Sequence, residues 1–210
     1  MASPVITITR QYGSGGSEVA RRVAAQLGWE VIDNEFVESV ARRAGLPRDE
    51  VAQLDERAPG LLERVARTLA AASPELFLAG GAPSAEHDEA AIVKMSERVI
   101  TEAAAHGRIV LVGRGAQAVL AKGPDALHVY VVASKAFRGK LAIERLGAPA
   151  AGIEKQLDEI DRRRDQYVRT HYGRIRDDVV NYDLVVNTER LGFDGAAGLV
   201  VAEARRRGWG

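Results

Sequence analysis

A glycine-rich turn between a short apolar segment and an amphipathic one constrains this chain more than any other feature of its sequence. Residues 4–9 are mostly apolar and β-branched, which is typical of a buried strand. Residues 18–27 have apolar side chains at helical spacing, and Gly28 follows as a helix stop. Between them, residues 10–17 read Arg-Gln-Tyr-Gly-Ser-Gly-Gly-Ser, and we call them the glycine turn. This order predicts a phosphate cradle, because backbone N–H groups at the start of the helix can converge on phosphate oxygens.

Two known patterns for such a turn can be compared with the sequence. The dinucleotide pattern G-x-G-x-x-G requires glycine where Glu18 stands, so it does not fit. The P-loop pattern G-x-x-x-x-G-K-[ST] fits at Gly15 and Ser17, but Gly16 takes the place of the lysine and Arg10 that of the first glycine. An altered P-loop is therefore the better interpretation, and a glycine turn that binds no ligand is the alternative.

Four further apolar segments predict strands, and helical periodicity fills most of the chain between them. These segments are residues 29–32, 109–112, 127–132 and 184–186. Short apolar strands separated by helices predict an α/β fold of the P-loop type, with a five-stranded parallel sheet covered by helices on both faces. The 210 residues are expected to form a single kinase-like domain, 1–210, with a helical insert at about 46–105 and a lid at about 151–176.

The composition narrows the classes of function. Lys+Arg and Asp+Glu each number 29, so the net charge is zero, whereas nucleic-acid-binding proteins normally have a basic excess. The absence of cysteine excludes disulfides and thiolate metal sites. No apolar run approaches the roughly 20 residues that span a bilayer, and the first residues do not form a secretory signal. We therefore expect a cytoplasmic protein without nucleic-acid or membrane partners.

Several motifs resemble bacterial cytidylate kinases and, more closely, the cytidylate kinase-like family. That family has the Arg-Gln-Tyr-Gly-Ser-Gly-Gly motif of residues 10–16 and the Tyr-Asp-Leu-x-x-Asn-Thr motif of residues 182–188. Residues 110–114, Val-Leu-Val-Gly-Arg, resemble the third-strand motif of the kinases, and the charged residues 159–165 resemble their arginine-bearing lid. The likeness covers nearly the whole chain.

The resemblance implies an ATP-dependent kinase that uses Mg²⁺ and phosphorylates a nucleoside monophosphate such as CMP. Ser17 occupies the position whose hydroxyl ligates Mg²⁺ in P-loop enzymes, and capping of the helix is its alternative role. Asn187 and Thr188 are expected near the adenine. The donor phosphates are expected at the turn and the first residues of the helix, namely Gly13, Ser14, Gly15, Gly16, Ser17 and Glu18.

The chain also departs from cytidylate kinases at positions that matter for chemistry. Their lysine and threonine are replaced by Gly16 and Glu18. Their Asp-Gly-Arg-Asp motif becomes Val-Gly-Arg-Gly at 112–115, and Glu38 and Ser39 stand where they have a Tyr-Arg pair. These departures keep two alternatives open: a nucleotide-binding regulatory protein without turnover, and a kinase for a non-nucleotide acceptor.

Arginines at the strand ends are candidate catalytic residues, because phosphoryl transfer depends on positive charge around the moving group. Arg10 can replace the missing lysine, since a guanidinium holds phosphate oxygens in a bidentate way, and an exposed loop arginine is the alternative. Arg114, between two glycines, is expected to hold the acceptor and to act in catalysis. Asp33, at the end of the second strand, is expected to contact the acceptor or to cap a helix.

Arg162, Arg163 and Arg169 are the candidate lid arginines. Positions 162, 165 and 169 share one helical face, so they form a charged stripe. A solvated helix with ion pairs is the ordinary meaning of such a run, but the resemblance favours a lid that closes over phosphates and excludes water. The helical insert is where acceptor choice or the contacts of a homodimer are expected to be determined.

Overall fold

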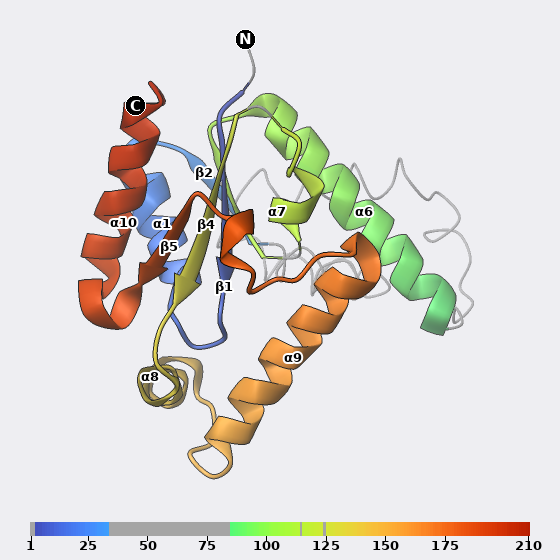
Figure 1. Ribbon diagram of the computed structural model, residues 1–210, viewed down its shortest axis with the longest axis vertical. Coiled ribbons are helices and arrows are strands. Elements are labelled where there is room, and N and C mark those ends of the chain that lie inside the picture. Colours follow the sequence, from blue (N-terminus) through green and yellow to red (C-terminus); the bar gives the residue numbers. More distant parts are fainter. Residues whose placement is uncertain (1–2, 34–84, 114, 124) are drawn as a thin grey trace, which may run out of the picture.

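The computed structural model describes residues 3–33, 85–113, 115–123 and 125–210. Five parallel strands form one sheet in the order β2-β3-β1-β4-β5 (Figure 1). The predicted α/β fold with a five-stranded parallel sheet is therefore confirmed. The strands are β1 (Val5–Arg10), β2 (Glu30–Asp33), β3 (Ile109–Val112), β4 (Ala126–Val132) and β5 (Leu184–Asn187).

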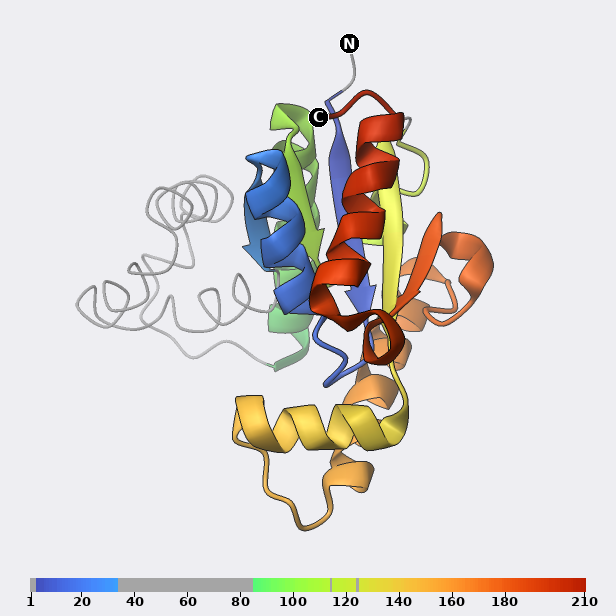
Figure 2. The ribbon, with the colours of Figure 1, turned by 90° about the vertical axis from the view of Figure 1, so that its left-hand side faces the viewer.

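Helices cover both faces of the sheet. Helices α1 (Gly16–Leu27) and α10 (Thr188–Arg206) lie side by side on one face, and α6 (Ala85–His106) and the short α7 (Ala116–Val119) lie on the other (Figures 1 and 2). Figure 2 shows α8 (Lys135–Leu146) and α9 (Ile153–Tyr172) beyond the carboxyl ends of the strands. A short 3₁₀ helix, η2 (Val179–Asn181), leads into β5.

The core consists of two layers because neighbouring residues of a strand point to opposite faces. On β3, Val110 and Val112 pack with α1 and α10, whereas Ile109 and Leu111 pack with α6 and α7. All four are buried, at 4% exposure or less. Burial on both faces explains why this strand is a continuous apolar run rather than an alternating one.

The helices differ from the sequence analysis at two places. Helix α8 was not expected as a separate element; the Ser134 side chain caps its start and Gly147, with a left-handed φ of 66°, ends it. The apolar face of residues 195–207 predicts a terminal helix over that range, whereas α10 begins at Thr188, because Asn187 caps it and the chain continues helically after a kink at Gly192. The kink divides α10 into two pieces, and the first piece is too short for its apolar periodicity to indicate a helix.

The structure describes the predicted insert only in part, whereas it describes the whole of the predicted lid. Residues 46–84 of the insert lie outside the described residues, and the rest of the insert belongs to α6. The predicted lid at about 151–176 contains α9. Among the helices in the described ranges, we find none with the length and apolar character that a bilayer crossing requires.

We expect Leu111→Ala to lower the free energy of unfolding by about 2–5 kcal/mol, because it leaves a cavity at a fully buried position. Leu199→Ala is the matched control, since Leu199 on α10 is 49% exposed, and it should cost about 0.5 kcal/mol. Urea unfolding followed by circular dichroism measures both. Equal costs would contradict the placement of Leu111 in the core.

Candidate active site

The glycine turn has the backbone geometry of an anion cradle. Gly13 and Gly15 have φ angles of 77° and 80°, in the left-handed region that favours glycine. Among the described residues, the backbone N–H groups of Gly15, Gly16 and Ser17 make no hydrogen bond to a protein acceptor. Three N–H groups at the start of a helix are therefore available to an anion.

Hydrogen bonds from two buried hydroxyl groups hold the backbone of the glycine turn in place. The side chain of Ser14 is fully buried, and its hydroxyl donates to the carbonyl oxygen of Gln11 at 2.8 Å. The buried Thr188 hydroxyl of α10 donates to the carbonyl oxygen of Ser14 at 2.7 Å. The turn is thus tied both to itself and to the last helix.

Two close approaches require glycine in the turn. A Cβ atom at Gly13 would lie 2.6 Å from the carbonyl oxygen of Arg138. A Cβ atom at Gly15 would lie 2.3 Å from the ring of Phe193, which follows the Gly192 kink in α10. Any side chain at these positions would displace its neighbour as well as strain the backbone.

Arg10, the last residue of β1, is buried beneath the turn at 6% exposure. Its aliphatic stem lies where a side chain at Gly16 would be, and its Nη1 lies where a Cβ of Gly113 would be. Its Nη2 is 3.6 Å from a carboxylate oxygen of Asp33. The other carboxylate oxygen of Asp33 accepts a hydrogen bond from the Ser17 hydroxyl at 3.0 Å. The structure thus brings together three predicted site residues: Arg10, Ser17 and Asp33.

Helix α9 docks onto the turn through Asp161. This carboxylate accepts a hydrogen bond from the backbone N–H of Tyr12 at 2.9 Å and another from Arg138 at 2.6 Å. Arg138 also donates to the carbonyl oxygen of Tyr12, and Arg176 approaches Asp161 to 3.6 Å. Asp161 is only 15% exposed, and both arginines are below 10%. A largely buried charge network therefore joins α8, α9 and the turn.

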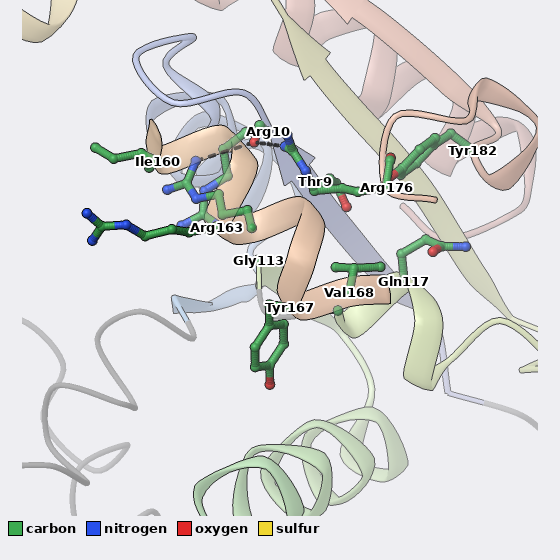
Figure 3. Close-up of a pocket in the computed structure, with 12 residues that line it drawn as sticks. Thr9, Arg10, Gly113, Gln117, Ile160, Arg163, Tyr167, Val168, Arg176 and Tyr182 are labelled. Carbon is green, nitrogen blue, oxygen red and sulfur yellow. Dashed lines mark hydrogen bonds between the residues drawn. The ribbon is translucent and has the colours of Figure 1, made fainter. Parts of the chain in front are cut away.

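Two more guanidinium groups reach the same turn. Arg164 and Arg176 donate to the carbonyl oxygen of Arg10 at 3.4 Å and 2.9 Å (Figure 3). Arg164 also lies over the ring of Tyr12, 5.7 Å from its centroid. Arg164 and Arg176 therefore bind the backbone of Arg10, whereas the residues at the ends of β2 and β3 contact its side chain.

Two cavities lie on either side of this group. The turn cavity has a volume of about 470 Å³. The glycine turn and the start of α1 line one side of it, and α8 and Phe193 line the other. The lid cavity, of about 250 Å³, lies between the ends of β1 and β3 and helices α7 and α9 (Figure 3). Arg10 and Arg164 line both cavities. They are therefore placed at the boundary between two ligand-sized spaces.

The lid cavity has a positive lining. Its described lining residues include Arg10, Arg163, Arg164 and Arg176, and no Asp or Glu is among them. Burial raises the pKa of the lining Tyr182 to about 12, so its hydroxyl is neutral at pH 7 and donates to the carbonyl oxygen of Arg176. Three of these arginines pair with carboxylates outside the lining, namely Asp33, Glu159 and Asp161, so the guanidinium groups offer N–H donors to an anionic ligand rather than a large net charge.

The predicted lid arginines are more exposed than Arg164, and they do not line both cavities as Arg164 does. Arg162 and Arg169 are exposed and line neither cavity. Arg163 lines the lid cavity but is 70% exposed and pairs with Glu159. Arg114 lies outside the described residues, so its predicted role stays a prediction.

The remaining predicted donor residues have supporting contacts. Glu18 lines the turn cavity and pairs with Arg21 and Arg22, and the hydrogen bond from Arg22 holds the pKa of that carboxyl below its usual value. Asn187 caps α10 by accepting from two backbone N–H groups. Neither Asn187 nor Thr188 lines either cavity, so their predicted contact with adenine stays a prediction.

Sequence reasoning placed residues 159–165 in the lid but did not identify which face of α9 docks onto the turn. The stripe at 162, 165 and 169 was favoured, whereas the face that meets the turn contains Asp161 and Arg164. The buried Leu157 and Val168 lie on that same face, at positions 157, 161, 164 and 168. The two apolar residues were the available signal for which side of the helix points inward. Arg138, Arg176 and Phe193 come from separate parts of the chain and gave no such signal.

The residues fit a nucleotide and a magnesium ion. The three N–H groups of Gly15, Gly16 and Ser17 suit phosphate oxygens. The Ser17 hydroxyl and the Asp33 carboxylate are adjacent oxygen donors of the type that Mg²⁺ prefers, and Mg²⁺ often uses only one or two protein ligands beside water and phosphate. The described residues contain no group of three or more His, Cys, Asp or Glu side chains arranged for a metal.

The sequence is similar to one known protein family. The sequence matches the model of the cytidylate kinase-like family over residues 5–190. No curated protein matches the chain significantly.

Solved structures share the fold at low sequence identity. An uncharacterized protein from Eubacterium ventriosum has a TM-score of 0.67 and 18% identity, with 96% of this chain and 98% of that chain covered. A shikimate kinase from Bacteroides thetaiotaomicron has a TM-score of 0.55 and 13% identity, covering 97% and 99%. A shikimate kinase from Acinetobacter baumannii, solved with shikimate, has a TM-score of 0.53 and 14% identity, covering 99% and 95%. The chain therefore has a P-loop kinase fold.

Gly15→Ala should destabilise the protein more than Gly28→Ala, although both glycines have positive φ angles of 80° and 67°. At Gly28 nothing lies within 4 Å of the added Cβ, so only the left-handed backbone cost of about 1–2 kcal/mol applies. At Gly15 the contact with Phe193 is added. Chemical unfolding measures the difference, and Phe193→Ala in the Gly15→Ala background should recover part of it. No difference between the two alanine variants would contradict the close packing of Phe193.

Asp161→Asn should lower the free energy of unfolding by about 3 kcal/mol, because it removes the carboxylate that pairs with the buried Arg138, whereas Arg176 keeps its pair with Asp165. Asp158→Asn on the same helix is the matched control: Asp158 is 61% exposed, pairs with Lys135 and should cost about 0–1 kcal/mol. Unfolding in urea at several salt concentrations compares them. Similar costs for both variants would show that Asp161 does not anchor the lid.

Proposed function

Because the chain belongs to the cytidylate kinase-like family, we propose that it transfers the γ-phosphoryl group of ATP to a small acceptor, with a nucleoside monophosphate such as CMP as the first candidate. The observation that supports this proposal is the position of Arg10 and Arg164, which line both the turn cavity and the lid cavity. A phosphoryl group that moves from one cavity to the other passes these two cations. Stabilisation of spread negative charge is the main contribution a protein makes to this reaction.

The glycine turn binds the donor in this proposal. Its three available N–H groups and the positive end of the α1 dipole face the phosphates. Ser17 and Asp33 hold Mg²⁺, which shields the phosphate charge when bound. Arg10 is oriented by Asp33 and by its close packing against Gly16 and Gly113. A guanidinium held in this way needs little rearrangement to contact the moving group.

The lid cavity receives the acceptor. Its four arginines and its lack of carboxylates among the described lining residues suit an acceptor that is itself an anion, as CMP is. Its apolar lining residues, Ile160 and Val168, together with Tyr167, suit a ring. Helix α9 covers this cavity and the turn together, so that it excludes water, which would otherwise compete with the acceptor for the phosphoryl group.

A non-nucleotide acceptor is the second candidate. Two structures with the same fold are shikimate kinases, and shikimate is a small carboxylate that a cationic cavity also suits. Both candidates use the same donor site and the same boundary arginines. An acceptor panel distinguishes them.

The test is phosphoryl transfer from ATP with Mg²⁺, followed by phosphorus NMR, to CMP, other nucleoside monophosphates, nucleosides and small hydroxy acids including shikimate. We expect transfer to an anionic acceptor, and Arg164→Ala should lower kcat/KM by about 10²-fold or more, because it removes a positioned cation. Arg205→Ala, at an exposed position near the end of α10, is the control and should leave kcat/KM unchanged.

Binding of ATP without transfer to any member of the panel would contradict the proposed kinase activity. It would favour the nucleotide-binding regulatory protein instead. Transfer to shikimate or a related hydroxy acid, without transfer to CMP, would replace the first candidate by the second.

A further inference from the structure

The glycine turn departs from the P-loop pattern G-x-x-x-x-G-K-[ST] at only two of its four specified positions, and the structure places these two in contact. Arg10 stands in place of the first glycine and Gly16 in place of the lysine. A Cβ atom at Gly16 would lie 2.5 Å from the Cβ and 2.9 Å from the Cγ of Arg10. The side chain of one position therefore fills the space that the other would need.

This contact makes the two departures dependent on each other. Real Cβ atoms essentially never approach another carbon to 2.5 Å, and the contact at Gly16 is with the first atoms of the arginine stem, which cannot swing away. A lysine at 16 is thus incompatible with Arg10 in its present position. In the standard pattern, glycine at the first position leaves that space empty and the lysine can occupy it.

The far end of Arg10 reaches the place where a phosphate-binding cation is needed. Its guanidinium is held between Gly113 and the Asp33 carboxylate, and the residue lines both the turn cavity and the lid cavity. A guanidinium is charged at every physiological pH and presents its N–H donors in a fixed planar fork, which suits phosphate oxygens. Gly113, at a φ of 76°, has no side chain to obstruct this position.

We propose that Arg10 and Gly16 are a reciprocal exchange, in which the phosphate-binding cation of a P-loop has moved from the first residue of α1 to the last residue of β1. The inference rests on the proposed function in that the cation serves the phosphates of the donor. It adds that Arg10 and Gly16 are required together. Converting both residues to the standard pattern restores a working site.

The experiment compares wild-type protein with Arg10→Gly, Gly16→Lys and the double variant, which reads Gly-Gln-Tyr-Gly-Ser-Gly-Lys-Ser over residues 10–17. Affinity for ATP with Mg²⁺ is measured by titration calorimetry, and turnover is measured with the best acceptor of the panel. Each single variant should lose turnover by about 10²–10³-fold. The double variant should regain at least ten-fold over either single variant, a gain that independent sites do not give.

Further variants separate the exchange from simple loss of folding. Arg10→Met keeps an aliphatic stem without the charge, so it should fold, as shown by its thermal midpoint, and yet bind ATP weakly. Gly198→Lys is the control for Gly16→Lys, because nothing lies within 4 Å of a Cβ at Gly198 in α10, and it should leave ATP affinity unchanged. Arg205→Gly is the control for Arg10→Gly.

ATP affinity equal to that of wild type in Arg10→Met would overturn the exchange, since Arg10 would then serve only to neutralise Asp33. A double variant no better than the single ones would overturn it as well. The proposed function is judged separately: if the wild-type protein binds ATP but phosphorylates no acceptor, the kinase activity fails. The exchange is then decided by the ATP affinities of the same variants.

Discussion

The ion pair between Arg10 and Asp33, at the carboxyl edge of the sheet, is the interaction on which the candidate site depends. The side chain of Arg10 links β1 to the ends of β2 and β3, and its carbonyl oxygen accepts hydrogen bonds from Arg164 and Arg176 on the lid side. The side chain of Arg10 therefore joins the turn to the sheet edge, and its backbone joins the turn to the lid. A single buried cation with partners on every side is more rigid than a lysine on a flexible stem, and that rigidity suits a group that must face a moving phosphoryl.

The fold could be predicted from the sequence because each strand is a short apolar run with helical periodicity on either side. β3 is the clearest case, since Ile109 to Val112 are apolar in succession and only a strand buried on both faces needs this. Helix α8 escaped the same reasoning because it covers the turn cavity rather than the sheet, so it buries only a few of its residues. The parallel direction of the strands was predicted, whereas their order in the sheet was not. Apolar periodicity also does not report the cap at Asn187 or the kink at Gly192, because the cap is a local polar contact and the kink uses the backbone freedom of glycine.

The site residues that follow a strand could be predicted from the sequence, whereas those on the inward face of a helix could not. Arg10, Ser17 and Asp33 follow strands β1 and β2 directly, and parallel strands bring their ends to one edge. The inward face of α9 had to be chosen from several charged stripes, and the choice depends on where Leu157 and Val168 are buried. Asp161 is informative here: a carboxylate in a cluster of arginines looks like a surface ion pair in sequence, but in the fold it joins the lid to the backbone of Tyr12.

The contacts of α10 with the glycine turn bear on how the protein is made. The Thr188 hydroxyl binds the carbonyl oxygen of Ser14 across 174 residues of sequence, and Phe193 packs on Gly15. During synthesis the turn emerges from the ribosome long before these partners do. The phosphate cradle is therefore incomplete until residue 193 has been added and α10 has docked, so a nascent chain that stops short of residue 193 lacks two of the contacts that support the proposed nucleotide site.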